Sequence, residues 1–201
     1  MPAQEHPSRR LILKRALAVG GLGLGVPHTT TMFAQTIAAP TPECRDGDDP
    51  TEPQIEGPFF KPRSPERADL VEPGTRGRLY QLEGLVLTRS CRPVAGALLD
   101  LWHANENGDY DDSGFRYRGH LFSDSAGRYR FRTILPGLYP GRTRHYHLKV
   151  QAPRQRILTT QLYFPNEPRN GHDDFFSPQL LMRVSQASPL SSAHFDFILN
   201  M

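Results

Sequence analysis

The sequence predicts an all-β fold, either an antiparallel two-sheet β-sandwich or a barrel, with an irregular N-terminal arm. From Leu79 onward, short apolar or alternating runs are separated by turn-rich segments. No stretch after residue 39 shows a sustained helical period with caps at both ends. Several short strands at this spacing favour a sandwich or a barrel. The predicted strands lie in LYQLEGLVLTR, VAGALLDLWHA, GRYRFRTILP, RHYHLKVQA, ILTTQLYF and AHFDFILN.

Residues 1–39 have the composition of an export signal. Ser8 to Lys14, SRRLILK, resembles the twin-arginine pattern. The apolar run that follows is rich in glycine, and it is too short and too weakly hydrophobic to form a stable membrane anchor. We therefore expect export to the periplasm or the extracellular space, without stable membrane insertion afterwards. An ordinary Sec signal or an uncleaved anchor is the alternative. Because the twin-arginine route carries folded proteins, often with a cofactor inserted, a cofactor is worth looking for.

Residues 40–78 form the predicted arm, and residues 79–201 the predicted β-sandwich domain. The arm is rich in Pro, Gly, Asp and Glu and has no apolar period. Within it, QIEGPFFKP contains a Gly-Pro turn that presents Phe59 and Phe60. The arm is therefore expected to be extended and irregular.

The charge of the chain excludes one class of partner. The whole sequence has 24 basic and 21 acidic residues, but residues 1–39 contain four basic residues and one acidic residue. The remainder is neutral, so it carries no electrostatic footprint for nucleic acid.

Two cysteines, Cys44 and Cys91, are present. In an oxidising compartment such a pair indicates a disulfide, and the chain lacks the second cysteine pair of a thiolate metal site. Two unpaired, buried thiols are the alternative.

The run RHYHLKV places His145 and His147 on one face of a strand and Tyr146 on the other. Two imidazoles on one face are a weak indication of a metal site. A carboxylate from the segment His172–Asp174 could complete a two-histidine, one-carboxylate site, although this polar segment is more typical of a solvated turn.

Two tyrosines upstream offer another completion. Tyr110 and Tyr139 each follow a glycine-containing turn at the end of a predicted strand, where a rigid scaffold can aim a side chain. The order is W-H-A-N-x-x-G-x-Y, then P-G-x-Y-P-x-R-x-x-H-x-H. Taken one at a time, each tyrosine is more typical of a core or rim aromatic.

This order of residues resembles the intradiol ring-cleavage dioxygenases, the catechol and protocatechuate type with non-haem Fe(III). The resemblance runs from about Cys44 to Phe164. It includes EGPFF, CRPVAGALLDLWHANENGDY, GRYRFRTILPGLYPGR and HYH in the family order. It implies the two-sheet β-sandwich, of the immunoglobulin or prealbumin-like kind, and favours a small exported branch whose oligomeric state is open. It also implies that the arm contributes to the rim of the active site.

The resemblance also implies residue roles. By position, the four iron ligands are Tyr110, Tyr139, His145 and His147, with Tyr139 also acting as a base. Arg142 matches the active-site arginine and Gln161 its glutamine partner. Phenolate oxygens suit a hard trivalent ion, and coordination would deprotonate them. The substrate pocket and its mouth are expected to include Gly57, Pro58, Phe59, Asp109, His103, Arg116 and Arg118, whereas Trp102 is expected in the core.

The function that follows is an exported Fe(III) dioxygenase acting on a small aromatic diol and O2. It would cleave the ring between the two hydroxylated carbons and give a muconate-type diacid. One alternative is an exported β-sandwich binding module without turnover. Another is a different metalloenzyme that uses His145, His147 and a carboxylate.

Overall fold

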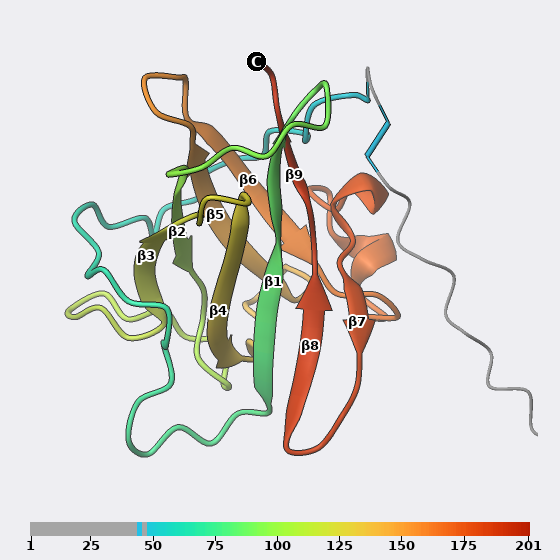
Figure 1. The fold of residues 1–201 in the computed structure, drawn as a ribbon. Helices are drawn as coiled ribbons and strands as arrows, with labels where there is room; N and C mark the ends of the chain where they lie inside the picture. The colour runs from blue at the N-terminus through green and yellow to red at the C-terminus, as the bar shows by residue number, and fades with distance from the viewer. Residues whose placement is uncertain (1–43, 46–47) are drawn as a thin grey trace, which may run out of the picture. The chain divides into compact units, whose positions relative to one another are not determined.

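The computed structural model describes residues 44–45 and 48–201, so the predicted signal segment 1–39 lies outside the described residues. Contacts group Pro42–Met201 into one compact unit. Two β-sheets pack face to face in this unit (Figure 1), so the predicted all-β sandwich is confirmed. In the part of the chain that the structure describes, no helix has the length and apolar character needed to cross a membrane.

The first sheet has the order β4-β1-β8-β7, with β9 also paired to β1. β1 is antiparallel to β4 but parallel to β8 and β9, which adds parallel pairs to the antiparallel sandwich expected from the sequence. The strands are β1 (Leu79–Thr88), β4 (Arg128–Ile134), β7 (Arg183–Ser185), β8 (Leu190–His194) and β9 (Phe197–Leu199).

The second sheet has the order β3-β2-β5-β6 and is antiparallel throughout. Its strands are β2 (Leu98–Trp102), β3 (Arg118–Phe122), β5 (His145–Gln151) and β6 (Leu158–Tyr163). Two short 3-10 helices, η1 (Asn170–His172) and η2 (Pro178–Leu180), follow β6.

The core lies between the two sheets. Alternate residues of each strand point into it, as the period of two in a strand requires. The fully buried side chains from the two inner faces include Leu82, Phe131, Tyr146, Leu148, Val150 and Phe197. Tyr146 is part of this core, and its hydroxyl donates to the carbonyl oxygen of Ile134 at 2.7 Å.

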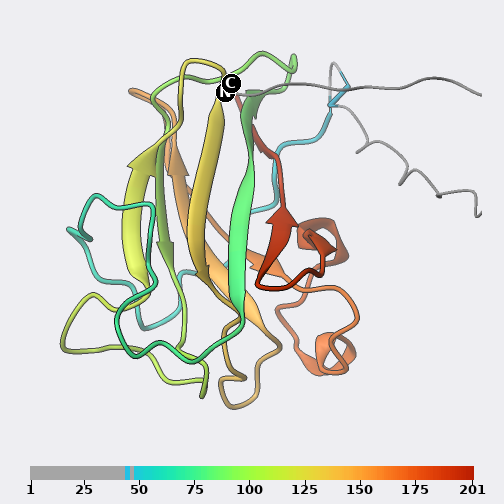
Figure 2. The same cartoon turned by 60° about the horizontal axis from the view of Figure 1, so that its bottom comes forward.

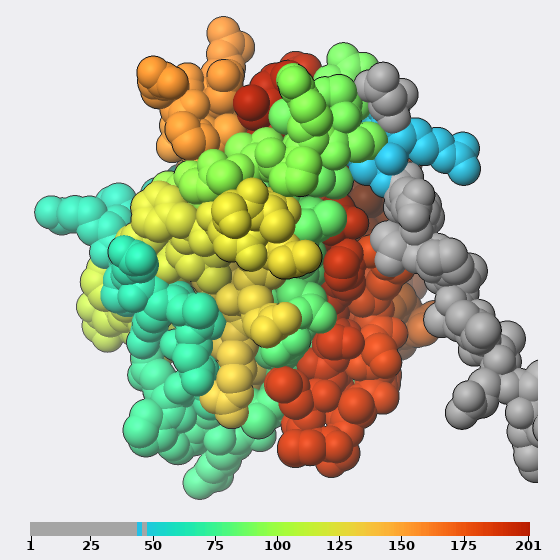
Figure 3. Space-filling model, viewed as in Figure 1, coloured from blue at the N-terminus to red at the C-terminus, as the bar shows by residue number. Residues whose placement is uncertain are grey.

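The arm packs against the second sheet and also reaches the first. It adds isolated bridges to β3 and β4, Glu66 with His120 and Asp69 with Arg132. Leu70, at the end of this stretch, is fully buried in the core cluster. Figures 2 and 3 show the teal part of the arm lying beside the yellow-green β3. Contacts between arm and sheet therefore extend over much of the arm.

A disulfide joins the start of the arm to the turn after β1. Cys44 and Cys91 are bonded, with 47 residues of sequence separation and a Cα–Cα distance of 5.6 Å. The expected pairing is present, and the described chain contains no free cysteine. The disulfide therefore attaches the first residues of the arm to the sandwich, whereas Leu70 attaches its last part.

Candidate active site

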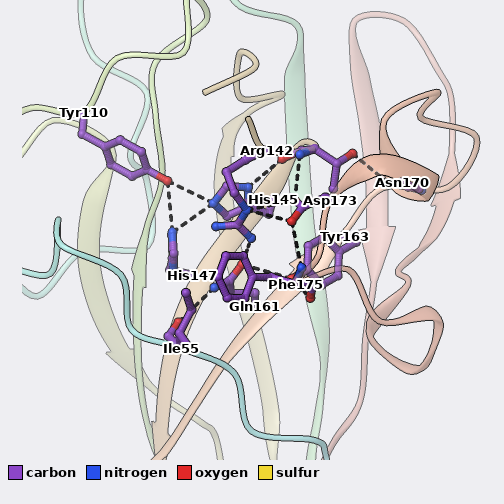
Figure 4. A network of polar contacts seen from close by, with 11 residues as sticks. Ile55, Tyr110, Arg142, His145, His147, Gln161, Tyr163, Asn170, Asp173 and Phe175 are labelled. Atoms are coloured by element: carbon purple, nitrogen blue, oxygen red, sulfur yellow. Dashed lines mark hydrogen bonds and ion pairs between the residues drawn. The ribbon is translucent and has the colours of Figure 1, made fainter. Parts of the chain in front are cut away.

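The site begins with the register of three neighbouring strands. Trp102 of β2 lies opposite His147 of β5, which lies opposite Gln161 of β6. Residues in register across a sheet point to the same face, so these three side chains form a row on the outer face. His145 and Tyr163 form the next row. Pairing alone therefore brings both histidines and the glutamine to one patch (Figure 4).

Three donor atoms converge on this patch. The Tyr110 hydroxyl oxygen lies 3.2 Å from Nε2 of His145 and 3.0 Å from Nε2 of His147. The two Nε2 atoms are 3.0 Å apart. Figure 4 shows the three atoms as the corners of a small triangle.

Both imidazoles are neutral in this setting. Nδ1 of His145 donates to the carbonyl oxygen of Thr143 at 2.7 Å, which leaves the lone pair on Nε2. Burial, with the nearby charge of Arg142, lowers the pKa of His145 to about 4. Burial also lowers the pKa of His147 well below its ordinary value. The ring of His147 stacks on Trp102, with centroids 5.0 Å apart and planes 7° apart.

Two glycines let the tyrosine-bearing loops meet. An ideal Cβ on Gly137 would lie 2.2 Å from the amide nitrogen of Gly108, and a Cβ on Gly108 would lie 2.4 Å from the carbonyl oxygen of Leu138. Any side chain at either position would separate the loops. Each glycine stands two residues before a predicted ligand, Tyr110 or Tyr139. The glycine of the repeated G-x-Y pattern is thus required by the close packing of the two loops as well as by the turns.

The two tyrosines occupy different positions in the patch. The Tyr110 hydroxyl reaches the histidines, whereas the Tyr139 ring lies edge-on to the Tyr110 ring with centroids 5.7 Å apart. Within the described residues, the Tyr139 hydroxyl makes no hydrogen bond. Burial raises the pKa of Tyr110 above its ordinary value, and the charges of Arg142 and Arg118 oppose this rise. A bound cation is needed to hold Tyr110 as a phenolate at neutral pH.

The donor set fits a hard metal ion. Neighbouring ligands of one ion, each at about 2.1 Å from it, stand roughly 3 Å apart. The separations of 3.0 to 3.2 Å among Tyr110, His145 and His147 match this spacing. An imidazole nitrogen and a phenol oxygen facing one another in a largely buried place are the donors that a ferric ion accepts. Tyr139 lies beside this triangle as the remaining predicted ligand.

Arg142 extends from the residues before β5 toward the patch. Its Nη2 donates to Oε1 of Gln161 at 2.6 Å, and its Nε donates to both carboxylate oxygens of Asp173, at 3.0 and 2.9 Å. Nε2 of Gln161 in turn donates to the carbonyl oxygen of Ile55 in the arm. The structure therefore brings together Arg142 and Gln161, the two residues predicted to assist the chemistry.

The arm completes the patch from the other side. Gly57 has φ +72°, and an ideal Cβ on it would lie 3.3 Å from Cε1 of His147, so the arm backbone passes close to this ring. The Phe59 ring stacks on Tyr110 with centroids 4.2 Å apart. Arg118, only 1% exposed, donates to the carbonyl oxygens of Phe59 and Asp111. This buried guanidinium ties the arm to the residue that follows Tyr110.

The other predicted pocket residues differ in position: Asp109 and Arg116 line a small pocket together with Tyr110. Asp109 is exposed, and its carboxylate accepts from the Asn105 side chain at 3.4 Å; Pro58 is also exposed. His103 is 1% exposed and is bonded to Ala104 and Thr133, so the expectation that it lines a mouth is wrong. Burial of Arg118 beneath the arm makes the same expectation wrong for that residue. Arg116 is exposed, and Trp102 is buried as expected.

Asp173 and Tyr163 were missed as members of the site. The position of Tyr163 follows from sequence, because it stands two residues after Gln161 on the same strand face. Asp173 lies in a loop, where no strand pattern indicates which way its side chain points. The sequence placed it in a solvated turn, but its side chain is 1% exposed and its oxygens accept from Arg142, Thr143 and Phe175. In the part of the chain that the structure describes, no three His, Cys, Asp or Glu side chains are grouped to hold a metal ion, so the alternative site with a carboxylate ligand is not formed.

Comparison with known proteins decides the family. A family model described as dioxygenase matches residues 55–200. The chain belongs to the intradiol ring-cleavage dioxygenase family. Among solved structures, the dioxygenase domain of a dioxygenase and carbohydrate-binding protein fusion from Streptomyces sp. SirexAA-E shares 53% identity and a TM-score of 0.75. That match covers 76% of this chain and 99% of the domain.

Curated relatives of the intradiol dioxygenase family are longer proteins. Hydroxyquinol 1,2-dioxygenase from Rhodococcus opacus is 32% identical over 159 residues, which cover 67% of this chain and 52% of the relative. Catechol 1,2-dioxygenase from Pseudomonas sp. (strain EST1001) is 28% identical over 180 residues, covering 76% and 58%. The chain thus spans about half the length of the curated relatives that it matches.

Proposed function

We propose that this protein is an exported, iron(III)-dependent intradiol dioxygenase. It cleaves a catechol-type aromatic between its two hydroxylated carbons and yields a muconate-type diacid. Both atoms of O2 enter the product, so the reaction requires no external electron donor. The observation that carries the proposal is the triangle of Tyr110, His145 and His147, in a chain of the intradiol dioxygenase family.

The metal would be held by Tyr110, Tyr139, His145 and His147. The chemistry supplied by ferric iron at such a site is the activation of a chelated catecholate toward O2. Thr143 keeps Nε2 of His145 free to bind, because its carbonyl oxygen accepts the hydrogen bond from Nδ1–H and so holds the proton on Nδ1. Tyr139, which is half-buried beside Tyr110, would as a phenolate accept one of the two catechol protons at its phenolic oxygen and become the neutral phenol.

The remaining residues bind and stabilise. Arg142 places a permanent positive charge beside the reacting ring, and Gln161 holds one edge of its guanidinium. Preorganised charge of this kind lowers a barrier by about 3 kcal/mol. Gly57 and Phe59 close the site over the histidines and Tyr110, which restricts the access of water.

The visible spectrum of the iron-reconstituted protein tests the function. Charge transfer from tyrosinate to Fe(III) is expected to give a broad red-brown band that moves to longer wavelength when catechol is added. Oxygen uptake should then accompany loss of catechol in a one-to-one ratio. Tyr110→Phe removes a ligand and should weaken the band and abolish turnover.

Tyr146→Phe is the matched control. Tyr146 neighbours both histidines in sequence but lies in the core on the opposite face, so its loss should leave the band unchanged. A protein that stays colourless after reconstitution contradicts the proposal. A protein that binds catechol without consuming O2 is instead a binding module.

Export by the twin-arginine route is also part of the proposal, and it is supported by the pattern SRRLILK at Ser8 to Lys14. Replacing both Arg9 and Arg10 by Lys should retain the protein in the cytoplasm, as measured by cell fractionation. Unchanged export of this double variant would indicate an ordinary Sec signal.

A further inference from the structure

Asp173 is a buried carboxylate in an otherwise exposed segment. Its side chain is 1% exposed, while Gly171, His172 and Asp174 are all exposed. A carboxylate is buried at a large cost in solvation unless it is well paired, so its contacts indicate what it does. Four hydrogen bonds reach its two oxygens. Two come from Nε of Arg142, one from the Thr143 amide at 2.8 Å and one from the Phe175 amide at 3.0 Å.

The guanidinium of Arg142 is held at two of its three nitrogens. Nε is bound to Asp173, and Nη2 is bound to Gln161. Within the described residues, Nη1 has no hydrogen-bond partner. An arginine side chain has five N–H donors in a rigid planar fork, so fixing two of its nitrogens also fixes the direction of Nη1.

The Phe175 ring and the Tyr163 hydroxyl also help to hold the Arg142 guanidinium in place. The guanidinium carbon of Arg142 lies 4.8 Å from the centroid of the Phe175 ring, which covers one face of the group. The Tyr163 hydroxyl donates to the carbonyl oxygen of Phe175 at 2.6 Å. The segment that carries Asp173 is therefore anchored to β6 at the position next to Gln161 (Figure 4).

We propose that Asp173 is a positioning residue that directs the Arg142 guanidinium at the substrate of the intradiol reaction. This inference rests on the proposed function, in which Arg142 stabilises charge on the ring. A long side chain contributes to a rate only when it is held within about 0.5 Å of its productive place. With Gln161 as its only partner, the Arg142 guanidinium could rotate about that single hydrogen bond. The second contact, from Nε to the Asp173 carboxylate, prevents this rotation.

A purely structural role predicts different results. If Asp173 served only to fold its own segment through the Thr143 and Phe175 amides, its loss would lower stability and iron content together. If it positions Arg142, its loss should lower kcat and leave metal and substrate binding in place.

Asp173→Asn removes the charge with little change in size. We expect iron content, the charge-transfer band and the catechol concentration that half-shifts the band to stay within about twofold of the wild type. We expect kcat to fall by about 10- to 100-fold, the usual range for residues that orient an active group.

Asp174→Asn, at the exposed neighbouring position, is the matched control and should leave all four measurements unchanged. Should Asp173→Asn fold poorly, Asp173→Glu keeps the charge and should lose less kcat.

A double-mutant cycle with Arg142→Gln decides whether Asp173 acts through the arginine. When Arg142 is already absent, Asp173→Asn should lower kcat by less than about twofold. Equal losses with and without Arg142 would overturn the inference, as would wild-type kcat in Asp173→Asn.

A measurement on metal-free protein separates this inference from the proposed function. In nitrogen-15-labelled protein, the Nε–H of Arg142 should exchange slowly with solvent, and Asp173→Asn should make it exchange at least tenfold faster. Asp174→Asn should not change the rate, and Arg142→Gln assigns the signal. Fast exchange in the wild type would overturn the inference. Absence of O2 uptake with any catechol would overturn the proposed function, while the exchange rates would still report whether Asp173 holds Arg142.

Discussion

His103 illustrates how burial sets the protonation of an imidazole in this sandwich. It lies at the end of β2, where Nδ1 donates to the carbonyl oxygen of Ala104 and Nε2 accepts from the Thr133 hydroxyl. Burial lowers the pKa of His103 to about 4; the charge of Arg118, and His145 once it is protonated, act in the same direction, whereas the hydrogen bond to Ala104 opposes them. This histidine is therefore neutral in the native state at pH values where it is charged in the unfolded chain.

The metal-free protein should lose stability as the pH falls from about 6.5 to about 4. In this window the unfolded chain binds a proton at His103 and the native state does not, so the free energy of unfolding falls with pH. The contribution of His103 is about 3 kcal/mol in full. Urea unfolding between pH 7 and pH 4.5, with a chelator present, measures it.

His103→Gln should flatten this dependence without abolishing it, because His145 and His147 also have lowered pKa values. Gln keeps an acceptor for Thr133, so the variant should still fold at pH 7. The exposed His172→Gln is the control and should leave the slope unchanged. The same slope in His103→Gln and the wild type would contradict this account.

At the scale of elements, the strands with a strong apolar pattern were predicted and the weak ones were not. The first five predicted runs correspond to β1, β2, β4, β5 and β6. β3 has no clean alternation, and β7 has three residues without a buried side chain, so neither gave a signal. Local pattern is informative only where one face of a strand is buried.

The run AHFDFILN was predicted as one strand but divides between β8 and β9. The division occurs at Phe195 and Asp196, where the chain crosses Gly84 of β1. An ideal Cβ on Gly84 would lie 1.8 Å from the carbonyl oxygen of Phe195, so only glycine permits this crossing. The Asp196 carboxylate then accepts from the Leu85 amide. Such contacts depend on distant parts of the chain, and for this reason the run itself gave no sign of the break.

In the candidate site, too, local sequence patterns predicted some contacts and not others. The alternation in RHYHLKV correctly separated Tyr146 from the two histidines, and family order pointed to Tyr110. By contrast, Asp173 reaches Arg142 from 31 residues away through a loop with no periodic pattern. Short-range patterns predict which face a residue occupies, whereas contacts between loops require the fold.

At the scale of the whole molecule, the arm and the sandwich behave as one unit. The arm contributes Leu70 to the core and the carbonyl oxygens of Ile55 and Phe59 to hydrogen bonds with Gln161 and Arg118. Near its start, the Thr51 amide donates to the carbonyl oxygen of Ile198 in β9. The sandwich therefore requires the arm both for its core and for its site.

A series of shortened chains tests this unity. A chain that starts at Pro42 keeps every described contact, and it should melt and bind iron like the full chain. A chain that starts at Pro50 loses the disulfide, which closes a loop of 47 residues and stabilises the fold by at most about 4 kcal/mol, so it should melt at a lower temperature yet still bind iron. A chain that starts at Leu79 uncovers Trp102 and Gln161 and loses Leu70 from the core, so it should neither fold cooperatively nor bind iron. Thermal unfolding and iron content measure each step, and cooperative unfolding of the Leu79 chain would contradict the view that the arm is part of the fold.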